Sequence, residues 1–312
     1  MFATLLGGLP RPPLPEPAGK APADPRWLDA LVARAIEAQE SAGLEPITDG
    51  RLRWRGLAGP MRALDGLGRA EDGTGVTATA LPTWTEPLST GAWRFAAAAT
   101  TRMVKQALPG PYSLGRRAVA ADSAGSGGVL GRPALTMAFA AALRSEVLAL
   151  AEAGCPLVEI EERDAALIGD DEAERRLFRD AHLALADGVA GIHLSLAIVG
   201  GSADGAGIET ILAAPYASLA VDLVDGPDNW RLVRDVPGDR GIVAGAMSPR
   251  HPSDDGPELL LWAAAYAASS NGRGPDRVGL ATAGSLAGLS WEHAERKLRR
   301  LGEAARLAAM PA

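Results

Sequence analysis

The strongest constraint on the fold is the repeated alternation of short apolar segments with longer helical patterns. The short segments resemble parallel strands that are buried on both faces. We predict eight of them, at residues 3–9, 45–50, 102–108, 156–162, 190–198, 218–224, 241–247 and 276–282. Eight such units in 312 residues predict an α/β protein with a (β/α)8 TIM barrel. An open doubly wound sheet is the alternative, but no strand leads into the GxGxxG turn of that fold.

Helix signals separate the predicted strands. Residues 24–43 begin with Asp24 as a cap and Pro25 in the first helical position, and they end at Gly43. Further helices are predicted at 133–154, 170–188, 207–215, 229–235, 256–270 and 290–308. The chain shows no internal repeat and no linker. We therefore predict one barrel domain over residues 1–312 with an irregular insert around 51–102, and a glycine-rich lid loop at 121–131.

Composition limits the classes of partner. The formal net charge is −7 and no stretch is strongly basic, so neither nucleic acid nor an anionic membrane is an expected partner. The longest apolar run, residues 259–268, is too short to span a bilayer. The N-terminal apolar run breaks into prolines and does not resemble a signal peptide. We expect a cytoplasmic protein that acts on a small molecule, and the sequence is compatible with a homodimer.

The predicted strand ends carry most of the polar residues that could perform chemistry. In a barrel, active sites lie at the C-terminal ends of the strands. The candidates are Arg11, Asp49, Arg51, Lys105, Tyr112, Glu161, Glu162, His193, Ser195 and Asp222. Buried charges are costly unless they are paired, so this mixture predicts either an internal salt-bridge network or a site for an anionic ligand. We favour the ligand site.

Several segments, in this order, resemble the catalytic barrel of the cobalamin-independent methionine synthases. They are LPRP at 9–12, AQESAGLEPITDG at 38–50, VKQALPGPYSLG at 104–115, EAGCPLVEIEE at 152–162, HLS at 193–195 and ERKLRRLGEAARLA at 295–308. That family shares its fold with uroporphyrinogen decarboxylase. The resemblance implies a TIM barrel whose site accepts a folate methyl donor and a thiol that zinc activates.

The resemblance also locates the family's zinc ligands, and here the sequence departs from the pattern. The His-x-Cys motif corresponds to His193 and Ser195, the glutamate ligand corresponds to Asp222, and the last ligand falls at Ala283 or Gly284. Both thiolates are therefore replaced. Zinc sites in proteins need three or four ligands, so we expect no zinc. Cys155, the single cysteine, precedes the fourth strand and is expected at the other end of the barrel.

The acceptor-binding segments of the family also differ here. Its DGE-like segment reads DGR, which places Arg51 where the resemblance implies a carboxylate. A cation at this position would attract a carboxylate group rather than an ammonium group. The second acidic segment supplies Glu161 and Glu162, followed by Arg163 where the family has proline.

These residues lead to a functional hypothesis with two alternatives. We expect a zinc-independent transferase of methyl, one-carbon or other small groups, acting on an anionic ligand such as a tetrahydrofolate derivative. Arg11, Arg51 and Lys105 would hold anionic groups, Glu161 would position the acceptor, and His193 would move a proton with Asp222 as its partner. The alternatives are a metal-free lyase or decarboxylase, in which Asp49 stabilises a developing cation, and a non-catalytic ligand-binding barrel.

Two histidines also have structural interpretations that need no catalytic role. His193 lies among apolar residues, and a core histidine bonded to a neighbouring strand is the alternative to a catalytic one. His182 lies in an amphipathic helical pattern and is expected to face solvent.

Overall fold

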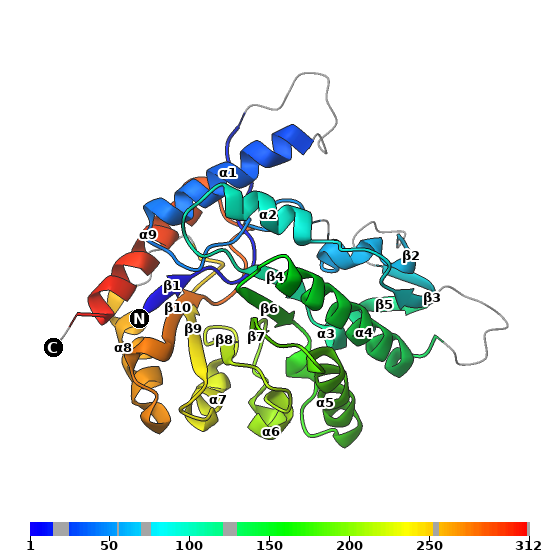
Figure 1. The fold of residues 1–312 in the computed structure, drawn as a ribbon. Coiled ribbons are helices and arrows are strands. Elements are labelled where there is room, and N and C mark those ends of the chain that lie inside the picture. The colour runs from blue at the N-terminus through cyan, green and yellow to red at the C-terminus, as the bar shows by residue number, and fades with distance from the viewer. Residues whose placement is uncertain (15–24, 55, 70–75, 121–129, 252–255, 311–312) are drawn as a thin grey trace.

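The computed structural model describes residues 1–14, 25–54, 56–69, 76–120, 130–251 and 256–310. A curled sheet of parallel strands forms its centre, and helices surround this sheet (Figure 1). The strand order is β1 (Phe2–Thr4), β10 (Val278–Thr282), β9 (Gly241–Met247), β8 (Ser218–Asp222), β7 (His193–Ile198), β6 (Leu157–Glu162) and β4 (Gln106–Pro109). The predicted α/β class is confirmed. The predicted cap Asp24 and most of the predicted lid, residues 121–129, lie outside the described residues.

The second predicted strand, residues 45–50, lies between β1 and β4 but forms only an isolated bridge. Ile47 pairs with Val104 in parallel, and the Glu45 N–H donates to the Ala3 carbonyl at 2.8 Å. Pro46 has no N–H to continue the ladder. The described sheet therefore has seven strands, with this short connection between its two edges, instead of the eight full strands that we predicted.

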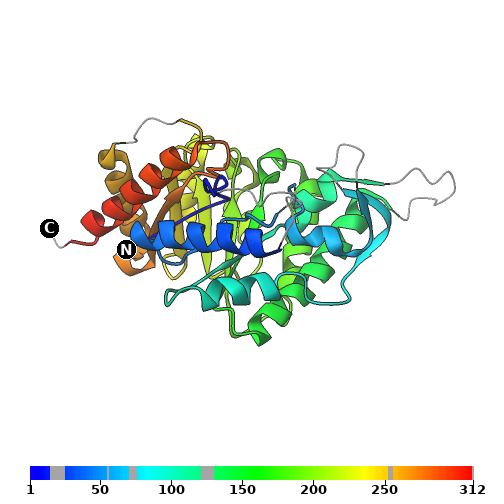
Figure 2. The same cartoon turned by 90° about the horizontal axis from the view of Figure 1, so that it is seen from above.

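The insert expected to be irregular contains a second sheet, which corrects our prediction. Strand β2 (Asp65–Arg69) pairs antiparallel with β3 (Val76–Thr83), and β5 (Ala118–Ala120) pairs parallel with β3. Val76 and Ala78 are buried on one face of β3, as the period of two in a strand requires. Helix α2 (Thr90–Ala98) follows in the same insert. This small sheet lies at the end of the molecule away from the C-terminal helices (Figures 1 and 2).

The helices follow the predicted pattern closely. They are α1 (Pro25–Ser41), α4 (Arg132–Glu152), α5 (Glu172–Ala186), α6 (Ile208–Ile211), α7 (Trp230–Asp235), α8 (Pro257–Ser269) and α9 (Trp291–Ala308). Caps explain some of the boundaries: the Asp171 carboxylate accepts N–H groups of α5, and the Ser290 hydroxyl accepts one of α9. The α3 helix (Pro111–Arg117) was not predicted, although Pro111 in its first turn is a helix-start signal.

Among the described helices, α4 is long and apolar enough to cross a membrane by length and composition alone. Half of that stretch is buried inside the fold, where α4 packs on α3, α5 and β3.

The interior of the curled sheet has its own small core, separate from the large core between sheet and helices. It consists of Leu6, Ala197, Val199, Ala220, Val243 and Ala281. Five of these six side chains are alanine or valine, and three of them lie on the central strands β7 to β9, so they fill little of the space that the sheet encloses. Larger polar side chains occupy both ends of the interior, and both ends contain cavities.

Candidate functional site

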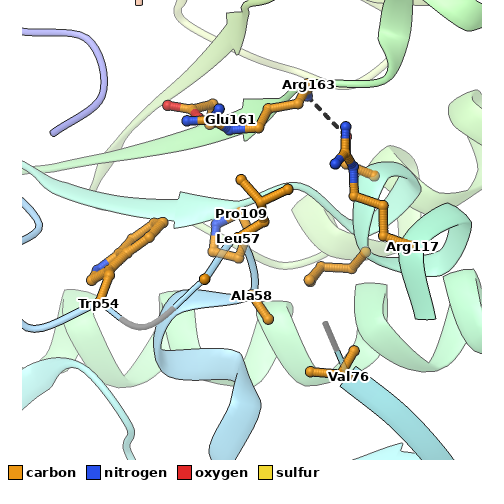
Figure 3. A pocket seen from close by; sticks show the side chains of 11 residues that line it. Trp54, Leu57, Ala58, Val76, Pro109, Arg117, Glu161 and Arg163 are labelled. Carbon is orange, nitrogen blue, oxygen red and sulfur yellow. Dashed lines mark hydrogen bonds and ion pairs between the residues drawn. The ribbon is translucent and has the colours of Figure 1, made fainter. Parts of the chain in front are cut away.

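A cavity of about 510 Å³ opens at the C-terminal ends of β4 and β6. Two smaller pockets of about 180 and 290 Å³ adjoin it, because Leu57 and Arg163 line all three. We call these three pockets together the mouth. The largest is lined by Trp54, Gly56, Leu57, Ala58, Val76, Pro109, Ser113, Leu114, Arg117, Glu161 and Arg163. Glu161 and Arg163 lie along one side of it, opposite the apolar side chains of the insert (Figure 3).

Glu161 in β6 is the centre of charge in the mouth. It is 2 % exposed, and it forms ion pairs with Arg51 and with Arg163, whose Nε lies 2.7 Å from Glu161 Oε1. Burial alone would raise the pKa of Glu161, but the attraction of the two guanidinium groups outweighs it and lowers this pKa to about 2. Glu161 is therefore ionised at neutral pH and cannot act as a general acid.

The turn after residue 50 holds Arg51 in the mouth. Arg51 has a left-handed φ of 55°, and its backbone N–H donates to Asp49 Oδ1 at 2.8 Å. Its guanidinium carbon lies 4.4 Å from the centre of the Trp54 ring, a cation–π contact. Burial raises the pKa of Asp49, while its contacts with Arg51 and Arg53 oppose that change. Asp49 thus acts on the mouth by fixing Arg51, and it lines none of the three pockets.

Glu162 and Tyr112, also predicted as ligand contacts, belong to a buried network behind β6. Glu162 accepts the backbone N–H groups of Tyr112 and Ser113 at 2.9 and 2.8 Å. His182 Nε2 lies 3.1 Å from Glu162, and the hydroxyl of Tyr112 donates to Glu174 at 2.5 Å. Consecutive strand residues face opposite sides, so Glu161 faces the interior whereas Glu162 faces the helices. The prediction of a solvated His182 is wrong, because this side chain is fully buried.

Lys105, His193 and Ser195 lie at the opposite end of the sheet. Lys105 precedes β4 and forms a buried pair with Glu159, with 2.6 Å between Nζ and Oε2. His193 is the first residue of β7, and its Nε2 lies 2.8 Å from Ser218 Oγ. All of these residues line a cavity at the N-terminal ends of the strands. The structure therefore divides the single site that we predicted into two.

The predicted pairing of His193 with Asp222 is wrong. His193 begins β7 whereas Asp222 ends β8, so the two side chains lie at opposite ends of adjacent parallel strands. Asp222 instead accepts the backbone N–H groups of Gly200, Val224 and Asp225 at 2.8 to 3.1 Å. Burial raises the pKa of Asp222, against the opposing effect of these hydrogen bonds.

The placement of β7 also corrects the alignment with the zinc motif. The residues that follow this strand at the mouth are Val199 and Gly200, which line one pocket with Asp222, Ala283 and Gly284. His193 and Ser195 therefore cannot be the mouth residues that the His-x-Cys comparison suggested. Cys155 lies just before β6 as expected, and burial raises the pKa of its thiol to about 11.

Three residues important for the mouth were not among our predicted contacts. Arg117 makes two parallel hydrogen bonds to Asp164, at 2.7 and 2.6 Å, and Arg163 reaches Glu161. Trp54 supplies an aromatic face. The sequence signal for Arg163 was its position two residues after Glu161, whereas Arg117 is the last residue of α3, a helix that was not predicted. Arg11, which we did predict, instead lies exposed over the ring of Trp27.

Comparison with solved structures agrees with this architecture. The B12-independent methionine synthase from Shewanella sp. W3-18-1, in complex with selenomethionine, matches with a TM-score of 0.81 and 16 % identity, over 98 % of this chain and 96 % of that one. A putative vitamin-B12-independent methionine synthase from Listeria monocytogenes matches with a TM-score of 0.78 and 17 % identity, over 100 % and 98 %. A methyltransferase from Methanosarcina mazei gives a TM-score of 0.64 and 16 % identity, over 93 % and 88 %.

The chain has the fold of these proteins. No family model matches the sequence, and no curated protein matches it. The similarity is therefore carried by the backbone, and the side chains of the mouth determine what this protein can bind.

Proposed function

We propose that the mouth binds an organic anion with an apolar body, and that the protein transfers a methyl or other small group without zinc. The observation that carries this proposal is the position of Glu161 between Arg51 and Arg163. Asp164 neutralises Arg117, so Glu161 lies between two guanidinium groups; Asp222 and Asp225 line the adjoining pocket, where Asp225 pairs with Arg250. The contact of Arg163 with Glu161 uses Nε, which leaves its terminal nitrogens able to donate to a ligand carboxylate.

The walls of the mouth suit the rest of such a ligand. Trp54, Leu57, Val76 and Leu114 provide apolar area next to the arginines. A volume of about 510 Å³ is within the usual range for small-molecule sites. A tetrahydrofolate derivative, which combines a ring system with carboxylates, is one ligand of this class.

The residues around Asp222 do not fit a zinc site. Val199, Gly200, Ala283 and Gly284 offer no metal-binding side chain, and backbone N–H groups already surround the Asp222 carboxylate. Within the described part of the chain, no group of three or more His, Cys, Asp and Glu residues could hold a metal ion. We therefore propose chemistry that depends on the protein's own side chains.

In this proposal Asp222, and not His193, is the residue that transfers a proton. Asp222 lines the mouth, and its raised pKa makes it better suited than Glu161 to carry a proton. Arg163 binds the anion, and Glu161 holds Arg51 and Arg163 in place. A non-catalytic ligand-binding barrel is the second candidate. Arg51 and Arg163 already pair with the Glu161 carboxylate, which is then not available to react with a ligand.

A binding experiment tests this proposal. Calorimetric titration with 5-formyltetrahydrofolate, a stable organic anion, should show saturable binding that Arg163→Ala weakens about tenfold or more. Arg34→Ala is the matched control, because Arg34 on α1 is similarly exposed and also pairs with glutamates, but lies outside the mouth. Equal affinity in Arg163→Ala and the parent would contradict the proposed anion site.

Turnover distinguishes the two candidates. With a methyl donor and a thiol acceptor, mass spectrometry should detect the methylated thiol, and EDTA should not reduce its rate. Binding without any methyl transfer would support the second candidate, a non-catalytic ligand-binding barrel. Transfer that EDTA abolishes and zinc restores would refute the zinc-independent reaction.

A further inference from the structure

The second large cavity lies at the N-terminal ends of the strands and has a volume of about 610 Å³. Its size follows from the small side chains that face it. Glu159, Ser195, Ser218 and Gly241 are paired in register across β6, β7, β8 and β9, so they form one row around the interior. Two serines and a glycine in this row leave space that larger barrel residues would fill.

Glu159 is the polar group in this cavity whose hydrogen bonding is incomplete. It is 2 % exposed, and its Oε2 accepts a hydrogen bond from Lys105. Its other oxygen, Oε1, is buried and has no hydrogen-bond partner among the described residues. A buried acceptor without a partner is costly, so the position favours a ligand that brings a donor.

Two neighbouring features define the chemistry of that donor. His193, Ser218 and Ser195 form a chain, with 2.8 Å from Nε2 to Oγ and 2.9 Å between the two hydroxyls. The charged lining contains more acid than base, with Glu45, Glu159, Asp239 and Asp276 against Lys105 and Arg277. An excess of carboxylates favours a cation.

We propose that the N-terminal cavity is a second ligand site, which binds a small primary amine on an apolar body. The ammonium group donates to Glu159 Oε1, and Phe2, Met103 and Leu157 contact the apolar part. The amine supplies the donor that Oε1 lacks and reduces the negative charge of the lining. This site does not depend on the function proposed for the mouth.

Benzylamine is a suitable probe, and Met103 is a built-in reporter because it lines the cavity. In protein labelled with 13C at the methionine methyl groups, NMR titration should move the Met103 signal to saturation. Met103→Leu identifies that signal by removing it. Benzyl alcohol, which lacks the charge, and benzoate, which reverses it, should bind at least about tenfold more weakly.

Variants locate the binding within the cavity. Ser195→Leu fills the space and Glu159→Gln removes the charge, and each should weaken benzylamine binding about tenfold or more. Ser195→Ala keeps the space and should bind within about threefold of the parent. Circular dichroism establishes that each variant is folded. If Ser195→Leu does not fold, Ser218→Leu fills the same space from β8.

Several results would overturn the site. They are a Met103 signal that does not saturate, equal binding of benzyl alcohol and benzylamine, or unchanged affinity in the folded cavity-filling variant. Arg163→Ala should leave benzylamine binding unchanged, since it changes only the mouth. Failure of one site therefore does not imply failure of the other.

Discussion

Two glutamates of β6, two residues apart, show how differently the ends of one strand can be used. Glu161 at the mouth is held by two guanidinium groups, whereas Glu159 in the N-terminal cavity has one ammonium partner and one free oxygen. Both side chains are 2 % exposed. The comparison shows that burial alone does not define a site, because the partners determine whether a buried charge is satisfied or still requires a ligand.

Glu161→Ala should have the largest effect on stability, because it leaves Arg51 buried without its partner. Loss of one member of a buried ion pair costs about 3–5 kcal/mol. Urea unfolding would measure this change. Arg51→Met with Glu161→Met should recover most of the loss, and a double variant as unstable as the single one would show that the pair is not the cause.

Acid should destabilise the protein through the same carboxylate. The folded-state pKa of Glu161 is about 2, below its usual 4.5. Its contribution to stability is therefore complete above about pH 5 and is lost as the pH falls toward 2, a change of about 3 kcal/mol. Unfolding measured between these limits should slope less steeply in the double Arg51→Met, Glu161→Met variant. If stability fell equally with pH in the parent and in the double variant, Glu161 would not be the source of the acid sensitivity.

Lys105→Met should cost about 2–3 kcal/mol, because it leaves the Glu159 carboxylate without its cation. The expected loss is smaller than that of Glu161→Ala, since Glu159 borders a cavity that can admit water. Binding of 5-formyltetrahydrofolate should not change. A tenfold loss of that binding at unchanged melting temperature would instead show that Lys105 contacts the ligand of the mouth, as we predicted from the sequence.

His193→Gln should have the smallest effect. His193 lies at the rim of the N-terminal cavity, so turnover at the mouth should remain near the parent value and stability should change by about 0.5 kcal/mol or less. Asp222→Asn is the informative counterpart, because it changes the mouth directly. A selective loss of turnover in His193→Gln would contradict the division into two sites.

The sequence alone predicted much of the fold, because apolar periodicity and helix caps are local signals. The strands around Glu161 and Asp222 and the long helices α4, α5 and α9 were all predicted near their observed bounds. The sheet of the insert was missed, because β2 reads DGLGR and so lacks the apolar alternation of a strand, and because β5 reaches β3 from a distant part of the chain. Pairing between distant segments leaves no local pattern to detect.

The candidate site separates what sequence determines from what tertiary structure decides. Arg51 and Glu161 were both predicted at the strand ends, and they meet there. The sequence also placed His193 and Asp222 on neighbouring strands, but it could not give their positions along those strands. Alternation assigns a residue to a face of the sheet, whereas its height depends on strand stagger and on where each strand begins. Only the assembled sheet showed that His193, Ser195 and Lys105 face one cavity and Glu161 and Asp222 the other.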